Sequence, residues 1–222
     1  SRPRRLADQA VAYPAWAPTG NQIALEIRGG ETHIGVLALG DGAVTDLGPG
    51  AVPSWSPDGR QLTFIAARGS NWDIYVIEPS QGAAPRALTT DERSDNQPEW
   101  GSRLAWSPDS KWVAFASRLT TLYRAIFVAN VETGEKRQVT DGLADAMYPV
   151  WDASGKYLWF LASTDLGLRS QWLDMTSYER LQTFGLYLAV LRKGEPSPVL
   201  PQSDEDAGVG AKSEPTPLTA SS

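Results

Sequence analysis

The stretch VPSWSPDGRQLTFIA, residues 52–66, joins a tryptophan, a tight turn and an alternating strand. In its turn, Pro57 presets φ, Asp58 can bond back to the backbone, and Gly59 supplies a positive φ. After the turn, apolar residues alternate with their neighbours over residues 61–66, which is typical of a β-strand. The stretch therefore predicts a β-hairpin that places a large indole just before its turn.

The same arrangement of tryptophan, turn and alternating strand recurs along the chain. YPAWAPTGNQIAL begins at Tyr13, LAWSPDSKWVAF begins at Leu104, and YPVWDASGKYLWF begins at Tyr148. The motif tryptophans follow one another at intervals of 39, 51 and 45 residues: Trp16, Trp55, Trp106 and Trp151. These intervals lie near the period of about 40–45 residues that is typical of β-propeller blades.

Each repeat continues with a second alternating run, a turn that contains glycine, and a short closing run. The closing runs are residues 43–47, 85–89, 136–140 and 196–200. Four short antiparallel strands, which we name a to d in chain order, make one propeller blade. We therefore predict an all-β fold: a β-propeller with about four blades of four antiparallel strands, part of a larger six- or seven-bladed propeller. The tryptophans are expected to fill the gaps between blades, because repetition at the blade period is what packing requires.

The chain divides into a repeat region and a polar tail. Residues 1–200 are predicted to form the blades, and residues 201–222, rich in proline, serine and acids, a disordered linker. The longest interval holds a second motif, NQPEW, which ends at Trp100 without the expected strand after it. Two interpretations stay open: a small insertion between blades, or a missing blade with a seam at Trp100/Gly101.

Composition narrows the classes of partner. The net charge of −6 argues against a nucleic-acid partner or an anionic membrane surface. There is no cysteine, so no disulfide framework is expected. No apolar run reaches the roughly 18 residues of a membrane span, and the start of the chain lacks the apolar core of a signal peptide. Because the chain begins without methionine, it is interpreted as processed or as a fragment. We expect a cytoplasmic location, with a periplasmic one as the alternative.

Function is predicted on one face of the propeller. Antiparallel strands place the regular a–b and c–d turns on one face, and the b–c loops and d–a connections on the other. The second face is irregular, and irregular loops on a rigid scaffold commonly carry function. The candidate interaction residues there are Arg68, Arg118, Tyr123 and Arg124, with Trp172, Asp174, Tyr178 and Arg180 in the long loop 163–183. An alternative stays open for this face: its mixed charges form only a solvated rim. For the long loop, two alternatives stay open, because it either caps the last blade or docks onto a neighbouring domain.

No catalytic, cofactor-binding or metal-binding residue is predicted. The one histidine, His33, lies in a predicted strand without an evident serine or aspartate partner. A weak set of calcium ligands and a set of acids of the glycosidase kind are the remaining candidates. They are Asp91, Asp95 and Asn96 for the first set, and Asp165, Asp174 and Glu179 for the second. Salt bridges to Arg169 and Arg180 are the expected role of the second set.

Two resemblances follow from these motifs. The cycle WSPDG (55–59), DIYV (73–76) and LT (88–89) resembles the propeller repeats of TolB-like proteins. Residues 102–206, which include LAWSPDSKWVAFAS and WLDMTSYER, are similar to the amino-terminal propeller region of tricorn-type serine peptidases. Members of that family continue from propellers into a PDZ module and a catalytic domain.

The second resemblance implies a non-catalytic propeller segment of a tricorn-like serine peptidase. Such a segment gates or guides peptide substrates and supports assembly. The implied partners are peptide or protein substrates and the catalytic and PDZ domains of the parent, with a homo-oligomer as a further option. No residue of this chain matches the catalytic residues of the family. The alternative is a TolB-like protein-interaction propeller of an envelope complex, and a third hypothesis is a sugar or small-molecule enzyme that uses the central channel.

Overall fold

The computed structural model describes residues 10–79, 84–90, 103–165 and 183–199. Every regular element in these ranges is a β-strand, so the prediction of an all-β fold is confirmed for this part of the chain. Accordingly, the described residues contain no helix long and apolar enough to cross a membrane. The strands form four antiparallel sheets, here called sheets 1 to 4 in chain order.

Sheets 1 and 2 each contain four strands in chain order. Sheet 1 consists of β1 (Ala10–Trp16), β2 (Gln22–Arg28), β3 (His33–Ala38) and β4 (Val44–Pro49). Sheet 2 consists of β5 (Ala51–Trp55), β6 (Leu62–Arg68), β7 (Asn71–Ile77) and β8 (Arg86–Ala87). The tryptophan of each motif is therefore the last residue of strand a, as the sequence predicts.

Sheet 3 repeats this order, whereas sheet 4 departs from it. Sheet 3 consists of β9 (Ala105–Trp106), β10 (Trp112–Arg118), β11 (Arg124–Asn130) and β12 (Lys136–Gln138). In the described residues, sheet 4 has three strands, β13 (Asp145–Trp151), β14 (Tyr157–Ser163) and β15 (Gly185–Val190).

The fourth strand predicted at residues 196–200 of sheet 4 is not formed over its described part, 196–199. Pro196 and Pro198 lack the N–H groups that a strand ladder needs, which disfavours pairing there. The segment instead folds over the a–b turn of sheet 4. Tyr157 donates its hydroxyl to the Pro196 carbonyl at 2.9 Å, and Lys156 Nζ lies 2.6 Å from Glu195 Oε1. This ion pair raises the pKa of Lys156.

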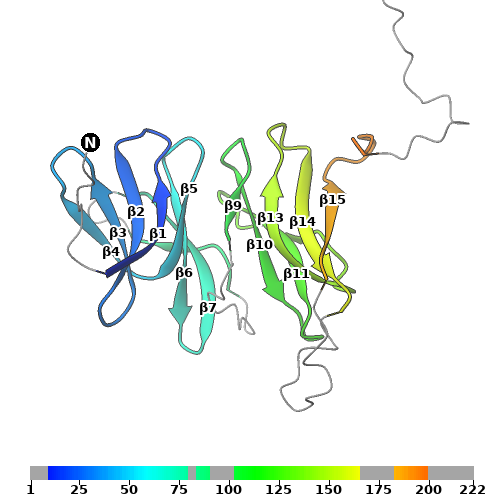
Figure 1. Ribbon diagram of the computed structural model, residues 1–222, viewed down its shortest axis with the longest axis horizontal. Coiled ribbons are helices and arrows are strands. Elements are labelled where there is room, and N and C mark those ends of the chain that lie inside the picture. The colour runs from blue at the N-terminus through cyan, green and yellow to red at the C-terminus, as the bar shows by residue number, and fades with distance from the viewer. Residues whose placement is uncertain (1–9, 80–83, 91–102, 166–182, 200–222) are drawn as a thin grey trace, which may run out of the picture.

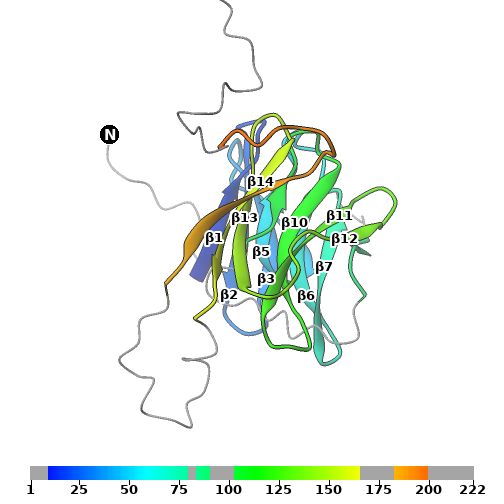
Figure 2. The same cartoon turned by 90° about the vertical axis from the view of Figure 1, so that its right-hand side faces the viewer.

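The sheets follow one another in chain order along the long axis of the molecule (Figure 1). Their first strands are neighbours, since β1 contacts β5, β5 contacts β9, and β9 contacts β13. Viewed along that axis, the sheets stand one behind another (Figure 2). Three hydrophobic clusters fill the three junctions between them.

One contact of the motif tryptophan is repeated at every junction. The indole Nε1 of Trp55 donates to the Ala15 carbonyl at 3.2 Å. Trp106 donates in the same way to Ser54 at 3.1 Å, and Trp151 to Ala105 at 3.0 Å. Each acceptor is the residue immediately before the tryptophan of the preceding sheet.

The expectation that all four motif tryptophans pack between sheets is wrong for Trp16. Trp55 and Trp106 are 7% and 8% exposed, as the packing role requires, but Trp16 is 60% exposed. The physical reason is positional. No described sheet precedes sheet 1, so the Trp16 ring has no junction to fill.

Candidate binding face

The described b–c loops and d–a connections lie together at the lower edge of the molecule in Figure 1, where the β6–β7 and β10–β11 hairpins turn. We call this edge the irregular face. Arg68 ends β6, and Arg118 ends β10 directly opposite Arg124 of β11. Tyr123 precedes Arg124, so the structure brings three of the predicted residues together at one hairpin.

The other predicted sites fall largely outside the described residues. This holds for Trp172, Asp174, Tyr178 and Arg180, for Glu179, for the Trp100/Gly101 seam, and for Asp91, Asp95 and Asn96. Of the predicted acids of the glycosidase kind, Asp165 is described. Its Oδ2 accepts the Thr183 hydroxyl, so this contact links the two ends of the long loop. A role of these residues in an interaction face stays a prediction.

Arg68 is tied to a buried acid. Its Nε lies 2.5 Å from Oδ2 of Asp73, whose side chain is fully buried, while the Arg68 side chain is 44% exposed. The Thr89 hydroxyl donates to the other Asp73 oxygen at 3.0 Å. A buried carboxylate needs such partners, because an unpaired charge away from water is costly. Arg68 therefore pairs with a buried carboxylate, while part of its side chain stays accessible to solvent.

Arg124 connects two sheets through a second buried acid. Its backbone N–H and its side-chain Nε each donate to Oδ1 of Asp145 at 2.9 Å. The Asp145 side chain, at the start of β13, is fully buried. Guanidinium groups suit such multiple contacts with a carboxylate. Arg124 is thus a structural clamp between sheets 3 and 4.

A third acid, Glu26, occupies the junction between sheets 1 and 2. It is 3% exposed, and its Oε1 accepts from Arg28 Nε at 2.7 Å. Its Oε2 lies 3.4 Å from the backbone nitrogen of Val52. Val52 has a positive φ of 56°, which is strained for a β-branched residue. The buried carboxylate therefore helps to hold a strained backbone position.

This strain is repeated within strand a of three sheets. Tyr13, Val52 and Tyr148 all have positive φ, and each precedes a proline. At each point the register of strand a shifts against strand b, which marks a β-bulge. Proline is tolerated there because strand a lies at the edge of its sheet. The bulge therefore recurs at one position of the repeat and bends strand a there.

A cavity of about 610 Å³ lies beside the first two of these bulges. Its lining includes Tyr13, Arg28, Glu31 and Trp72. The Arg28 guanidinium carbon lies 5.7 Å from the centre of the Tyr13 ring, within cation–π range. Aromatic and charged groups on a recess of this size suit contact with a peptide or a small polar molecule.

His33 has a partner that the sequence analysis missed. Its Nδ1 lies 2.9 Å from Oδ2 of Asp46, on the neighbouring strand β4. Burial opposes the ionisation of Asp46, but the Gly48 N–H and His33 outweigh it and lower the pKa of Asp46. The Nε2 atom of His33 lies 3.8 Å from a Glu31 carboxylate oxygen. A histidine flanked by two carboxylates, rather than by a serine hydroxyl, does not assemble the Ser-His-Asp arrangement.

Two exposed leucines add apolar area to the irregular face. Leu122, in the β10–β11 loop, is 62% exposed and has a φ of 69°. Leu143, in the connection from sheet 3 to sheet 4, is 78% exposed. Isolated leucines in loops carry no repeat signal, so the sequence alone does not point to these two residues. Within the described ranges, no group of three or more metal-binding side chains is found.

No family model matches the chain. Among curated relatives, an uncharacterized protein of Agrobacterium fabrum is 29% identical over 129 residues, which are 54% of this chain and 41% of that protein. The Tol-Pal system protein TolB of Anaeromyxobacter dehalogenans is 31% identical over 102 residues, 43% of this chain and 23% of TolB. The uncharacterized peptidase YuxL of Bacillus subtilis is 26% identical over 156 residues, 68% of this chain and 21% of YuxL. The chain thus spans less than half the length of these relatives.

Solved structures with the same arrangement of sheets include TolB and protease propellers. TolB from Acinetobacter baumannii has a TM-score of 0.56 at 23% identity, covering 69% of this chain and 38% of TolB. The tricorn protease has a TM-score of 0.60 at 18% identity, covering 85% of this chain and 18% of the protease. The β-propeller domain of the Trilobed protease from Pyrococcus furiosus has a TM-score of 0.58 at 13% identity, covering 82% of this chain and 54% of that domain. These comparisons support a TolB-like propeller fold, and at such identities they concern the fold alone.

Proposed function

We propose that this chain is a non-catalytic β-propeller segment of a tricorn-like serine peptidase, in which it guides peptide substrates and supports assembly. The observation that carries the proposal is the state of the two end sheets. The outer faces of sheets 1 and 4 present side chains that the inner junctions bury. A chain with such ends is suited to act as part of a larger propeller.

The exposure of equivalent residues in strand c shows that the outer face of sheet 4 is uncovered. Ile74, Ile126 and Leu186 pair with the corresponding residues of strand b in sheets 2, 3 and 4. Ile74 and Ile126 are 3% and 0% exposed, whereas Leu186 is 66% exposed. Trp16 is exposed in the same sense at the opposite end. Further blades of the parent protein, packed on these two faces, would bury both side chains.

The assignment to a peptidase draws on the extent of the likeness. Residues 102–206 resemble the tricorn-type propeller region in sequence. The match to YuxL also extends over 68% of the chain. An extended likeness weighs more than a local one here, because propeller repeats are shared by many proteins. The irregular face, with Arg68 and the exposed leucines Leu122 and Leu143, is our candidate for contact with peptides. We place the parent enzyme in the cytoplasm.

A second candidate function is a TolB-like protein-interaction propeller. It is favoured by the 31% identity to TolB over 102 residues. In that case the arginines and exposed leucines of the irregular face bind a folded protein partner, and the periplasm is the expected compartment.

The deciding experiment uses the product of the complete gene and this 222-residue chain side by side. Under the peptidase proposal, the full product hydrolyses fluorogenic peptides, while the 222-residue chain does not. A phosphonate that modifies catalytic serines should abolish the activity of the full product. A full product that cleaves no peptide but retains a protein partner during purification would favour the TolB-like function. Cell fractionation with an antibody against the chain tests the compartment separately.

A further inference from the structure

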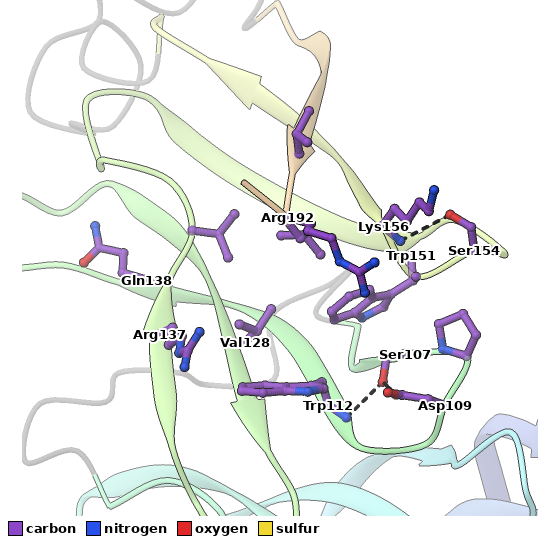
Figure 3. A pocket seen from close by; sticks show the side chains of 15 residues that line it. Ser107, Asp109, Trp112, Val128, Arg137, Gln138, Trp151, Ser154, Lys156 and Arg192 are labelled. Carbon is purple, nitrogen blue, oxygen red and sulfur yellow. Dashed lines mark hydrogen bonds between the residues drawn. The ribbon is translucent and has the colours of Figure 1, made fainter. Parts of the chain in front are cut away.

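A pocket lies between sheets 3 and 4, on the side of the a–b turns and therefore away from the irregular face (Figure 3). Its volume is about 560 Å³, which is within the usual range for ligand sites. Sheet 3 contributes Trp112 and Arg137 to its wall, and sheet 4 contributes Trp151, Lys156 and Arg192. We call it the junction pocket.

The preceding junction shows why this one is open. Between sheets 2 and 3, the Arg86 side chain donates to the Val131 carbonyl and so bridges the two sheets. Arg137 is the counterpart of Arg86, since both lie in strand d opposite equivalent valines of strand c. Leu191 is the counterpart of Val131, because each donates its N–H to the a–b turn of its own sheet.

Arg137 does not make the bridge that its position predicts. It pairs instead with Glu135, at 2.7 Å between Nη2 and Oε1. Its guanidinium carbon lies 5.7 Å from the centre of the Trp112 ring. The bridge to Leu191 is therefore absent, and the space between the sheets stays open at this point. Residues 196–199 of sheet 4 also form no strand d beside β15.

The aromatic walls of the pocket are held in place. The Trp151 indole is anchored by its bond to the Ala105 carbonyl. Where the two a–b turns meet, a Cβ added at Gly155 would be in ordinary van der Waals contact with Pro108, 3.6 Å from its Cδ. Because the bond to Ala105 fixes the Trp151 ring, that indole face needs little reordering to receive a flat ligand.

The charges in the pocket favour an anion. Arg137, Lys156 and Arg192 line it, against one acid, Asp109. Asp109 already accepts from Ser107 and from the Lys111 N–H. Lys156 is held by Glu195, but among the described residues Arg192 has no carboxylate partner. Figure 3 shows the Arg192 guanidinium beside the Trp151 ring, directed toward the interior of the pocket.

We propose that the junction pocket binds the carboxyl-terminal residue of a peptide that ends in an aromatic side chain. The terminal carboxylate pairs with the Arg192 guanidinium, which matches a carboxylate in two parallel hydrogen bonds. The aromatic ring lies against Trp151 and Trp112, where edge-to-face or offset contacts stabilise it. That the ligand is a peptide rests on the proposed function. The chemistry of the pocket requires only an aromatic carboxylate.

The test is titration calorimetry on the 222-residue chain with three pentapeptides. The probes are Gly-Gly-Gly-Ala-Phe as the free acid, the same peptide as its terminal amide, and Gly-Gly-Gly-Ala-Ala as the free acid. The expected order of affinity places the first at least about tenfold above each of the others, because each control lacks one of the two contacts. N-acetyl-phenylalanine distinguishes a small aromatic acid from a peptide, and equal binding by it would overturn the peptide assignment.

The matched variants are Arg192→Gln and Arg60→Gln. Arg60 is 84% exposed in the a–b turn of sheet 2, away from the pocket, so its loss should leave affinity unchanged. Arg192→Gln should lower affinity for the free acid about tenfold or more and abolish its advantage over the amide. Equal affinity for acid and amide, unchanged binding by Arg192→Gln, or no binding at millimolar peptide would overturn the proposal. None of these outcomes bears on cleavage by the full gene product, so the two proposals fail separately.

Discussion

Trp16 and Trp55 occupy the same position in successive sheets, yet the first is 60% exposed and the second 7% exposed. The difference comes from their neighbours. Trp55 packs against sheet 1 and donates to Ala15, whereas no described sheet precedes Trp16. A tryptophan at this position of the repeat therefore contributes less to the free energy of unfolding in sheet 1 than in sheet 2.

This pair gives a direct stability test. Trp55→Ala should lower the free energy of unfolding by about 3–5 kcal/mol, because it removes a large buried side chain and leaves a cavity. Trp16→Ala is the matched control and should cost less than about 1 kcal/mol. Urea denaturation followed by far-ultraviolet circular dichroism measures both. Equal losses would show that Trp16 is packed in solution.

A second comparison tests the outer face of sheet 4. Ile126→Ala should cost about 2–5 kcal/mol, because Ile126 is fully buried. Leu186→Ala, at the equivalent position, should cost less than about 1 kcal/mol, because its side chain is already in water. The same denaturation experiment applies, at low protein concentration. A large loss for Leu186→Ala would mean that its face is covered in the free chain.

The ion pair between Arg124 and Asp145, which joins sheets 3 and 4, can be removed by substituting the buried acid. Asp145→Ala removes the partner of Arg124 and leaves a guanidinium only 22% exposed without its carboxylate. Loss of one member of such a pair costs about 3–5 kcal/mol. Glu132→Ala, at an exposed acid of the c–d turn at the opposite end of sheet 3, is the control and should change stability little. Thermal melting would contradict this expectation if both variants unfolded at the wild-type temperature.

The a–b turn of sheet 4 should make stability sensitive to acid. Burial opposes the ionisation of Asp152, but the Ser154 hydroxyl and the Tyr157 N–H outweigh it and hold the pKa below the ordinary 3.8. A carboxyl with a lower pKa in the folded state contributes stability above pH 3.8, and this contribution is lost as the pH falls through the folded pKa. Asp152→Asn should therefore make the loss of stability between pH 4 and pH 2 less steep. Denaturation at a series of pH values measures that slope, and an unchanged slope would exclude Asp152 as a contributor.

The hairpins were predictable because their signals are local. A turn such as Pro57-Asp58-Gly59 and the alternation after it act within a few residues, and the structure places strands where both occur. Residues 196–199 form no strand d in sheet 4, and a local signal for this was present in Pro196 and Pro198. The prediction of a strand there followed the repeat pattern instead. A missing N–H is a stronger constraint than a periodic expectation.

The candidate site was predicted less fully, because its contacts cross between elements. Arg124 was recognised as a residue of the irregular face, yet its contact with Asp145 joins residues 21 positions apart in neighbouring sheets. The His33–Asp46 pair depends on the bulged register of β3 and β4. The junction pocket exists because Arg137 fails to make a contact that Arg86 makes. Differences of this kind depend on the three-dimensional contacts of equivalent residues, which the sequence does not show.

The indole contacts between sheets use a backbone acceptor, and this has an evolutionary consequence. Ala15, Ser54 and Ala105 have different side chains, but each offers the same carbonyl to the tryptophan of the following sheet. A duplicated repeat would carry both groups of this hydrogen bond. Its tryptophan is the donor to the preceding sheet, and the carbonyl of the residue before that tryptophan is the acceptor for the following sheet. Copies could then be inserted or lost without matched changes in their neighbours. A gene built from such units can lengthen or shorten by whole units and keep this backbone contact at each new junction.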